Sequence, residues 1–175
     1  MDQDIVFRRA VEADMPEIMR VVREAQAFMR GLGIDQWQDG YPEPRTLLED
    51  IGIGQLYVFA EGDAVRAVAA LSLIEEPVYG SIEGAWRTGG NEKYLTIHRM
   101  ATDDASRGRG LAARMLEQAE RIANENGCAS VRVDTHPGNA AMRRFLEKHG
   151  FEYCGVVYYY VKKGLPDRVA YEKLL

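Results

Sequence analysis

One short stretch constrains the fold of this chain most. It is the turn Arg107–Gly110, which lies between an apolar run at Tyr94–Thr102 and a helical pattern that begins at Leu111. A strand that passes through a glycine-rich turn into a helix directs several backbone N–H groups, and the positive end of the helix dipole, at one point. The two glycines allow close approach of an anion and the two arginines add positive charge. The turn therefore predicts a phosphate-binding site.

Three kinds of phosphate site compete at this turn. A Walker loop needs Lys-Ser/Thr after its last glycine, and the turn has neither, which excludes a P-loop. Residues 108–113 match the dinucleotide pattern GxGxxA, and Asp134 lies at about the right distance for a ribose contact. However, the residues after Asp134 are too few to supply the other strands and helices of a doubly wound sheet.

The third kind of site is carried by two motifs. Arg107-x-x-Gly110-x-Ala112 resembles motif A of the Gcn5-related N-acetyltransferase (GNAT) superfamily, Q/R-x-x-G-x-G/A. Residues 139–151 are similar to that family's N-x-x-A-x-x-x-Y-E-K-x-G-F. Two motifs in the right order are more specific than either alone. The resemblance covers nearly the whole chain and implies an α/β (α+β) fold. Its sheet would be mixed, mostly antiparallel and twisted, with about six or seven strands, about four flanking helices and a splayed parallel strand pair that forms the coenzyme A cleft.

The pattern of apolar residues and turn signals predicts the elements of that fold. Strands are expected at 5–9, 56–60, 64–74, 94–102, 130–134, 151–161 and 169–171. Helices are expected at 15–31, 44–51, 111–125 and 139–148, the first capped by the Asp14 carboxylate. The strands at 94–102 and 130–134 should pair in parallel because a helix joins them. Residues 77–90 are expected to be irregular, and residues 164–167 to form a turn.

Length and charge narrow the class of protein further. With 175 residues and 46% hydrophobic residues, the chain is expected to form a single domain over residues 1–175. It has no apolar run of membrane-spanning length and an acidic start where a signal peptide is basic, so a cytoplasmic protein without a membrane partner is expected. A net charge of −5 without a basic stripe argues against a nucleic-acid partner. Cys128 and Cys154 are too isolated for a disulfide framework or a metal site, and the oligomeric state stays open, a homodimer included.

The resemblance implies which residues bind acetyl-coenzyme A (acetyl-CoA), the acetyl donor of the superfamily. The backbone after the middle of the strand at 94–102 would pair with the pantetheine arm, the turn would hold the diphosphate, and the start of the helix at 139–148 would contact the arm from the other side. The residues implied are Met100, Ala101, Thr102, Arg107, Gly108, Arg109, Gly110, Leu111, Ala112, Asn139 and Met142. Asn139 also has a plain structural interpretation, since asparagine is a favoured helix N-cap.

The reaction implied is the attack of a neutral amine on a thioester. An alkylamine is neutral only in about one molecule in a thousand at neutral pH, so a general base helps. His98 is one candidate, because strand alternation would place it on one face with Met100 and Thr102. The alternative for His98 is a structural histidine bonded to a neighbouring strand. Asp134, at the end of the opposite strand, is the other candidate; it could also hold the ammonium group of the acceptor or serve only as a turn cap.

One position departs from the family pattern. The usual tyrosine, which protonates the departing thiolate, corresponds to Leu146. Either another group such as Tyr158 or Cys154 approaches the sulfur, or the thiolate leaves unassisted. A non-catalytic sensor that only binds acyl-CoA therefore stays open beside an acetyltransferase.

The acceptor is expected to be an amine on a small molecule or a peptide. Aromatic and acidic side chains suit a cationic acceptor through cation–π and charge pairing. The residues expected at the acceptor are Trp37, Tyr41, Glu83 and His136. For the two aromatic residues, packing of their loop against the protein body is an equal alternative.

Overall fold

The computed structural model describes residues 4–159 and 167–175 and divides into two compact units. The N-terminal unit comprises residues 1–71 and 99–116, and the C-terminal unit comprises residues 72–98 and 117–175. Three elements, two strands and a helix, contain residues of both units. Each unit is described in turn.

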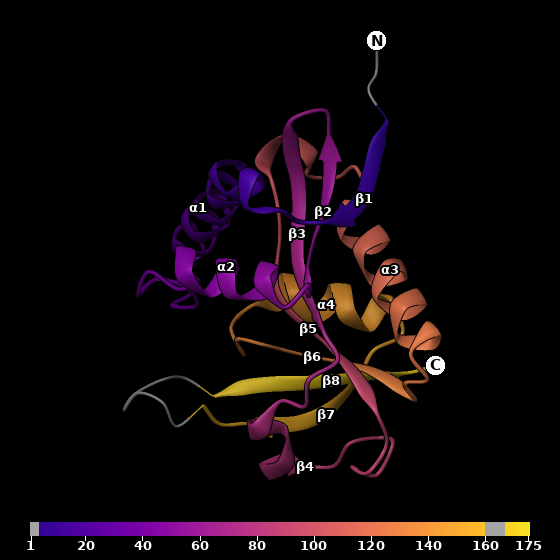
Figure 1. The fold of residues 1–175 in the computed structure, drawn as a ribbon. Helices are drawn as coiled ribbons and strands as arrows, with labels where there is room; N and C mark the ends of the chain where they lie inside the picture. The colour runs from indigo at the N-terminus through magenta and orange to yellow at the C-terminus, as the bar shows by residue number, and fades with distance from the viewer. Residues whose placement is uncertain (1–3, 160–166) are drawn as a thin grey trace. The chain divides into compact units, whose positions relative to one another are not determined.

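The described residues contain eight strands and four α-helices (Figure 1). The strands are β1 (Ile5–Arg9), β2 (Leu56–Glu61), β3 (Ala64–Ser72), β4 (Glu83–Gly84), β5 (Tyr94–Thr102), β6 (Ser130–Thr135), β7 (Glu152–Val157) and β8 (Arg168–Leu174). The helices are α1 (Met15–Gly31), α2 (Pro44–Gly52), α3 (Leu111–Glu125) and α4 (Ala140–Lys148), and the 3-10 turns are η1 (Glu12–Asp14), η2 (Pro77–Ser81) and η3 (Asp104–Ser106).

The strands follow the order β1-β2-β3-β5 in the N-terminal unit and β5-β6-β8-β7-β4 in the C-terminal unit, and together form one eight-stranded sheet. The β5–β6 pair is parallel, whereas β1–β2, β2–β3, β6–β8, β7–β8 and β4–β7 are antiparallel. The expected mixed, mostly antiparallel α/β fold is thus confirmed, with one strand more than expected.

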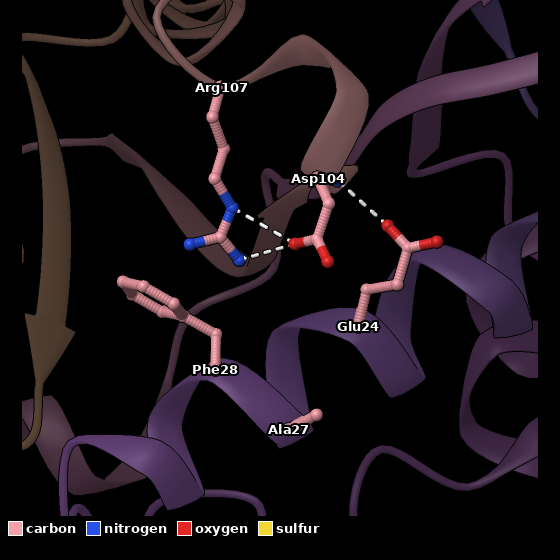
Figure 2. Close-up of a pocket in the computed structure, with 5 residues that line it drawn as sticks. All are labelled: Glu24, Ala27, Phe28, Asp104 and Arg107. Carbon is pink, nitrogen blue, oxygen red and sulfur yellow. Dashed lines mark hydrogen bonds and ion pairs between the residues drawn. The ribbon is translucent and has the colours of Figure 1, made fainter.

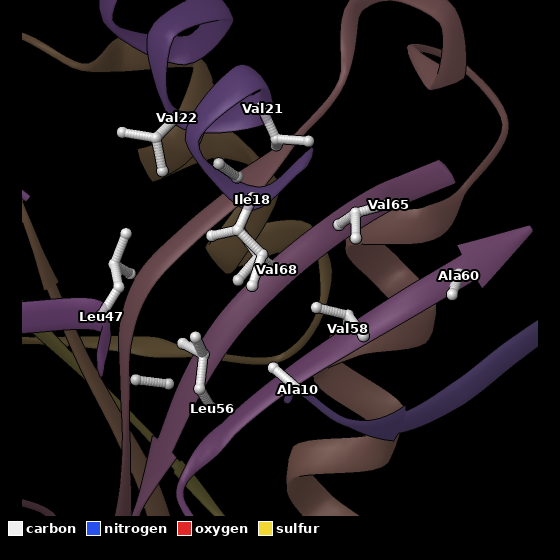
Figure 3. Close-up of a cluster of buried hydrophobic side chains, with 12 residues drawn as sticks. Ala10, Ile18, Val21, Val22, Leu47, Leu56, Val58, Ala60, Val65 and Val68 are labelled. Atoms are coloured by element: carbon white, nitrogen blue, oxygen red, sulfur yellow. The ribbon is translucent and has the colours of Figure 1, made fainter. Parts of the chain in front are cut away.

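In the N-terminal unit, α1 and α2 lie on one side of β1, β2 and β3 (Figure 1). The apolar residues of α1 recur at three-residue and four-residue spacing, so they form one stripe. Ile18, Val21 and Val22 of that stripe are fully buried against residues such as Leu56 and Val68 of the β2–β3 hairpin (Figure 3). Burial of each such side chain contributes about 1.5–3 kcal/mol, so the cluster fixes both helices on the sheet.

The expected capping of α1 by Asp14 is wrong. Asp14 occupies the N-cap position but makes no side-chain cap bond to the helix. Its carboxylate instead accepts a hydrogen bond from the Val11 N–H (2.9 Å) and pairs with Arg8 (2.7 Å). The backbone of Asp14 is helical rather than extended, and a helical cap residue does not point its side chain at the first amides of the helix.

In the C-terminal unit, the parallel ladder runs from Tyr94–Ser130 to Ile97–Val133, and both β5 and β6 continue beyond its last pair. The segment expected to be irregular contains η2 and the two-residue strand β4, which pairs with β7. A Cβ atom on Gly84 would lie 2.1 Å from the Cys154 carbonyl oxygen, so this close approach requires glycine. A strand this short leaves no periodic pattern in the sequence.

Five strands differ from their expected bounds. β2 and β6 each end one residue later than expected, at Glu61 and Thr135, and β3 ends at Ser72 rather than residue 74. β7 spans 152–157 rather than 151–161, and β8 spans 168–174 rather than 169–171. Most of the expected turn at 164–167 lies outside the described residues.

Both cysteines are buried free thiols, as expected. None of the described helices is long and apolar enough to cross a membrane. Among the same residues there is no group of three or more His, Cys, Asp or Glu side chains that could hold a metal ion.

Candidate functional site

The turn before α3 has the backbone conformation that its glycines suggest. Gly108 and Gly110 have φ angles of 78° and 76°, in the left-handed region. A Cβ atom on either residue would meet no other atom within 4 Å, so lack of space is not the reason for glycine here. The reason is the left-handed conformation itself, which costs other residues about 1–2 kcal/mol.

The amides of this turn point away from the protein's own acceptors. The N–H groups of Gly108, Gly110, Leu111, Ala112 and Ala113 donate to no other described residue, and the first bond of the helix is Arg114 N–H to Gly110 C=O (3.0 Å). The first turn of α3 also carries no acidic residue. Five available donors at the positive end of a 15-residue helix make this turn a site for an anion.

Arg107 is held beside the turn by two partners. Its guanidinium lies 3.7 Å from the centre of the Phe28 ring and 2.6 Å from the Asp104 carboxylate (Figure 2). With Glu24 and Ala27 of α1, these residues line an open cavity of about 320 Å³. The ion pair is largely solvent-exposed, and such pairs contribute at most about 1 kcal/mol, so an incoming phosphate can compete with Asp104 for Arg107.

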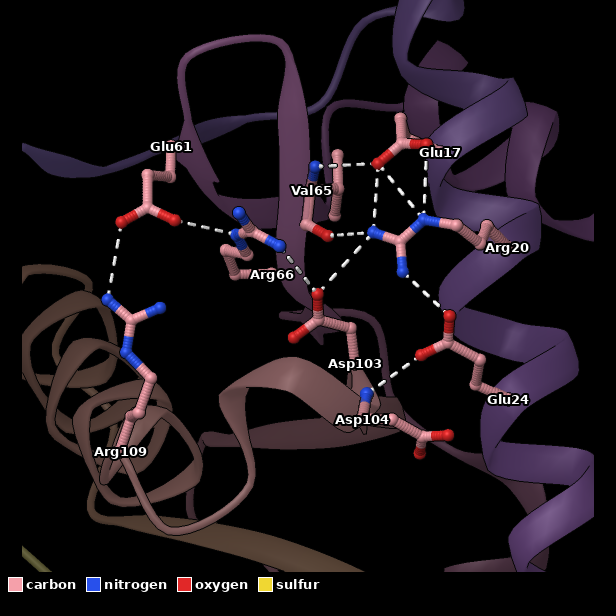
Figure 4. Close-up of polar contacts among 9 residues, drawn as sticks. All are labelled: Glu17, Arg20, Glu24, Glu61, Val65, Arg66, Asp103, Asp104 and Arg109. Atoms are coloured by element: carbon pink, nitrogen blue, oxygen red, sulfur yellow. Dashed lines mark hydrogen bonds and ion pairs between the residues drawn. The ribbon is translucent and has the colours of Figure 1, made fainter. Parts of the chain in front are cut away.

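Arg109 is also paired with a carboxylate. Its guanidinium lies 3.2 Å from Glu61, at the end of β2 (Figure 4). Glu61 in turn binds Arg66 (2.8 Å), and Arg66 binds the fully buried Asp103 (3.0 Å), the residue after β5. This chain of ion pairs connects the β2–β3 hairpin to both ends of the segment that carries η3. Both arginines of the turn are therefore paired with carboxylates of the protein.

The second half of β5 contains one residue with an irregular backbone conformation. Arg99 has a φ of 53°, which is strained for a residue with a side chain. Its guanidinium makes two bonds to the buried Asp50 (2.7 and 2.8 Å) and donates to the Tyr41 hydroxyl (2.8 Å). The alternation that was expected to place His98 on one face with Met100 and Thr102 is broken at Arg99. Of the three following residues, only Ala101 is buried, in the cluster of the N-terminal unit.

The two aromatic residues expected at the acceptor differ in their surroundings. Trp37 is half-buried and packs against the apolar cluster of the N-terminal unit, which agrees with its packing interpretation. Tyr41 stays partly exposed, with its hydroxyl bound to Arg99 and its carbonyl to Gln26 (3.0 Å). Tyr41 is therefore the aromatic side chain of this loop that remains accessible.

In the C-terminal unit, Asp134 lies near the end of β6 at the centre of a small polar cluster. The hydroxyls of Tyr79 and Tyr159 both donate to its Oδ2 atom, each at 2.7 Å. Burial raises the pKa of the Asp134 carboxyl, and the two tyrosine hydrogen bonds oppose that rise. Burial also raises the pKa of Tyr79 well above its ordinary value, so Tyr79 stays a proton donor at neutral pH.

His98, the other candidate base, has a carboxylate partner. Its Nε2 atom lies 3.4 Å from the Glu76 carboxylate, and both side chains are about one-fifth exposed. A carboxylate at this distance can orient an imidazole ring and stabilise its charged form.

The remaining expected residues of the C-terminal unit make local contacts. Glu83 accepts a hydrogen bond from Tyr158 (2.6 Å), and the His136 Nδ1 atom accepts one from the Gly138 N–H (2.9 Å). The side-chain Oδ1 atom of Asn139 accepts a hydrogen bond from the Met142 N–H (3.1 Å), so Asn139 caps α4 as its structural interpretation predicts.

The position that corresponds to the family's usual tyrosine is buried. Leu146 is fully buried in its unit, and of its two suggested replacements Cys154 is also buried and donates to the Glu152 carbonyl. Tyr158 is bound to Glu83.

Comparison with known proteins shows the family of this chain. The profile of the Acetyltransferase (GNAT) family matches residues 20–151. A GNAT-family acetyltransferase structure from Streptococcus agalactiae is 35% identical, with a TM-score of 0.85, over 100% of this chain and 98% of that one. This chain belongs to the GNAT family.

Two further proteins are less similar to this chain. YesJ of Bacillus subtilis, named an uncharacterized N-acetyltransferase, is 26% identical over 149 residues, which is 83% of this chain and 81% of YesJ. The PaiA N-acetyltransferase of Thermoplasma acidophilum, whose structure is a complex with coenzyme A, shares the fold: its TM-score is 0.71 at 16% identity over 98% of this chain and 99% of that one.

Membership in the GNAT family excludes the dinucleotide-binding alternative, because the sheet is mixed rather than doubly wound and parallel. The family uses acetyl-CoA, and the turn fits that ligand: unpaired amides and two nearby arginines are the donors a diphosphate requires. The sequence had no signal for Tyr79, Tyr159, Glu76 or Asp50, because each acts through a partner that is distant in sequence or lies in an irregular segment.

Proposed function

We propose that this protein transfers the acetyl group of acetyl-CoA to a primary amine by direct attack. The observation that carries the proposal is the set of five amides at the start of α3 that donate to no other described residue, those of Gly108, Gly110, Leu111, Ala112 and Ala113. Such a set binds a diphosphate, which is the charged part of coenzyme A. The names of two relatives, both N-acetyltransferases, support nitrogen as the atom that is acetylated.

The donor would be held along its length by residues of both motifs. Residues 107–112 would bind the diphosphate, with Arg107 and Arg109 exchanging Asp104 and Glu61 for phosphate oxygens. The backbone of residues 100–102 would pair with the pantetheine arm, and Asn139 and Met142 would contact that arm. Acetyl-CoA supplies the reactive thioester.

We assign the role of general base to Asp134. Its carboxylate would take a proton from the acceptor ammonium, and the nitrogen lone pair would then attack the carbonyl carbon. The C–N bond forms, the C–S bond breaks, and the electron pair of that bond leaves on sulfur. The nitrogen then releases its second proton to become a neutral amide, and the sulfur takes up a proton to leave as the free thiol. A base whose pKa is raised toward neutrality is suited to this task, and burial raises that of Asp134. His98, oriented by Glu76, is the second candidate base.

The acceptor would be a cationic amine on a small molecule or peptide. Tyr41 is the accessible aromatic residue that suits an ammonium group, and Glu83 and His136 are the polar residues assigned to the same role.

The test is release of free thiol from acetyl-CoA in the presence of a panel of primary amines. An acetyltransferase releases thiol in proportion to acetylated amine. The alternative, a sensor that binds acyl-CoA without turnover, predicts coenzyme A binding with no thiol release by any amine. Asp134→Asn should lower kcat by about 10²–10⁴, the usual contribution of a general base, and leave coenzyme A binding unchanged. His98→Ala with the same loss would instead make His98 the base.

A further inference from the structure

We propose that Tyr79 and Tyr159 are positioning residues that hold Asp134 by its Oδ2 atom and leave its Oδ1 atom to take the proton of the acceptor amine. This inference rests on the proposed function, in which Asp134 is the base. It adds two residues that neither motif of the family contains.

The first observation is that both hydroxyls bind the same oxygen. Tyr79 and Tyr159 each donate to Oδ2 at 2.7 Å, whereas no described residue donates a hydrogen bond to Oδ1. An ionised carboxylate accepts bonds at both oxygens. Two donors on one oxygen fix the plane of the carboxylate and leave the other oxygen as its available proton acceptor.

The second observation is that Tyr79 is rigid. Its side chain is only 1% exposed, its ring packs against Trp86 (4.8 Å between ring centres), and its carbonyl accepts the Trp86 indole N–H (2.9 Å). A hydroxyl held this firmly defines one position for Oδ2. Tyr159, just after β7, is half-buried and provides the second donor from another element.

The third observation concerns charge. Tyr79, Tyr159 and Arg168 of β8 each stabilise the ionised form of Asp134, and burial opposes them. Glu76, beside η2, acts on Tyr79. The other titratable groups next to this cluster along the chain are His98, after the last paired residue of β5, and His136. Removal of either tyrosine hydroxyl should thus raise the pKa of Asp134 further.

A purely structural role would require only that the buried hydroxyl and carboxyl groups satisfy each other. That role predicts a change in stability and none in the pH dependence of catalysis. The positioning role predicts both.

The experiment compares Tyr79→Phe and Tyr159→Phe with the wild type by the pH dependence of kcat at saturating acetyl-CoA and amine. Each variant should shift the acidic limb of the profile upward by about one pH unit, a tenfold change in the acid constant. kcat should fall about tenfold, while KM for acetyl-CoA stays unchanged. The matched control is Tyr171→Phe, since Tyr171 is fully buried and its hydroxyl binds Arg143 (3.0 Å) rather than Asp134.

The inference is overturned if the profile of Tyr79→Phe superimposes on that of Tyr171→Phe. If Tyr79→Phe does not fold, the half-buried Tyr159→Phe carries the same test. Carbon-13 NMR titration of the Asp134 carboxyl gives a readout that needs no turnover, and it should show the same upward shift. Asp134→Asn separates the two proposals. An inactive Asp134→Asn with an unshifted Tyr79→Phe refutes only the positioning role, whereas a fully active Asp134→Asn refutes the base as well.

Discussion

The clamp between Arg99 and Asp50 offers the sharpest test of the packing described for the N-terminal unit. The guanidinium and carboxylate are joined by two bonds of 2.7 and 2.8 Å, and their side chains are only 11% and 6% exposed. Asp50→Asn keeps the shape of the side chain but leaves the Arg99 charge buried without its counter-ion. Loss of one partner of a buried ion pair costs about 3–5 kcal/mol. In a chain of this length, that loss corresponds to a Tm lower by roughly 6–20 °C.

The adjacent residue provides a matched control. Glu49 lies on the same helix and pairs with Arg45 at 2.9 Å, but these side chains are 62% and 85% exposed. Glu49→Gln should cost less than about 1 kcal/mol because exposed ion pairs contribute little. Urea unfolding of both variants, followed by circular dichroism, measures the difference. If Asp50→Asn costs no more than Glu49→Gln, the reasoning from burial is refuted.

Three further predictions concern the turn and the acid. Gly110→Ala should lose about 1–2 kcal/mol of stability and raise KM for acetyl-CoA at least tenfold. The control is Gly127→Ala at the other end of α3, which has a similar φ and no steric contact; it should lose about the same stability and keep its KM. Equal KM values for the two variants would contradict the role of the turn. Glu61→Gln should tighten coenzyme A binding by up to about fivefold in calorimetry, because Glu61 no longer competes for Arg109, and weaker binding would contradict this. Burial raises the pKa of Asp134 in the folded state above its value in the unfolded state, so the free energy of unfolding falls as the pH rises from the unfolded to the folded pKa. Asp134→Asn should therefore have a higher Tm than the wild type near pH 8 and lose this advantage in acid. A lower Tm for Asp134→Asn near pH 8 would contradict this direction of the pKa shift.

The sequence predicts those elements for which the hydrophobic pattern, the turn residues and the helical spacing all indicate the same structure. β5 and α3 begin where expected because an apolar run, a glycine-rich turn and a helical stripe follow one another without conflict. β1 and the hairpin at Glu61–Asp63 are recovered for the same reason.

The features that the sequence does not reveal depend on distant partners. The left-handed φ within β5 occurs at Arg99, and arginine carries no sequence signal for that conformation. The Arg99 side chain is held by Asp50, which is 49 positions away in the sequence. Asp14 has the sequence of a helix cap, but a charged partner, Arg8, binds its carboxylate instead. Local pattern cannot rank such competing partners, because their free energies depend on burial and on tertiary distance.

The candidate site divides in the same way. The backbone part of the candidate site, Gly108–Ala112, follows from local chain geometry, and its two left-handed glycines lie within the motif. The side-chain part does not follow from local geometry, since Tyr79 and Tyr159 reach Asp134 from an irregular segment and from the chain after β7. No spacing in the sequence links these three residues.

The central claim is that the amides before and within the first turn of α3 bind the diphosphate of acetyl-CoA. Amide NMR of the nitrogen-15 labelled protein tests it directly, with coenzyme A as the ligand and pantetheine, which lacks the diphosphate, as the control. The account predicts that the signals of Gly108, Gly110, Leu111, Ala112 and Ala113 shift on saturation with coenzyme A and stay in place with pantetheine. Signals that stay unshifted at saturating coenzyme A, or that shift equally with pantetheine, would contradict it.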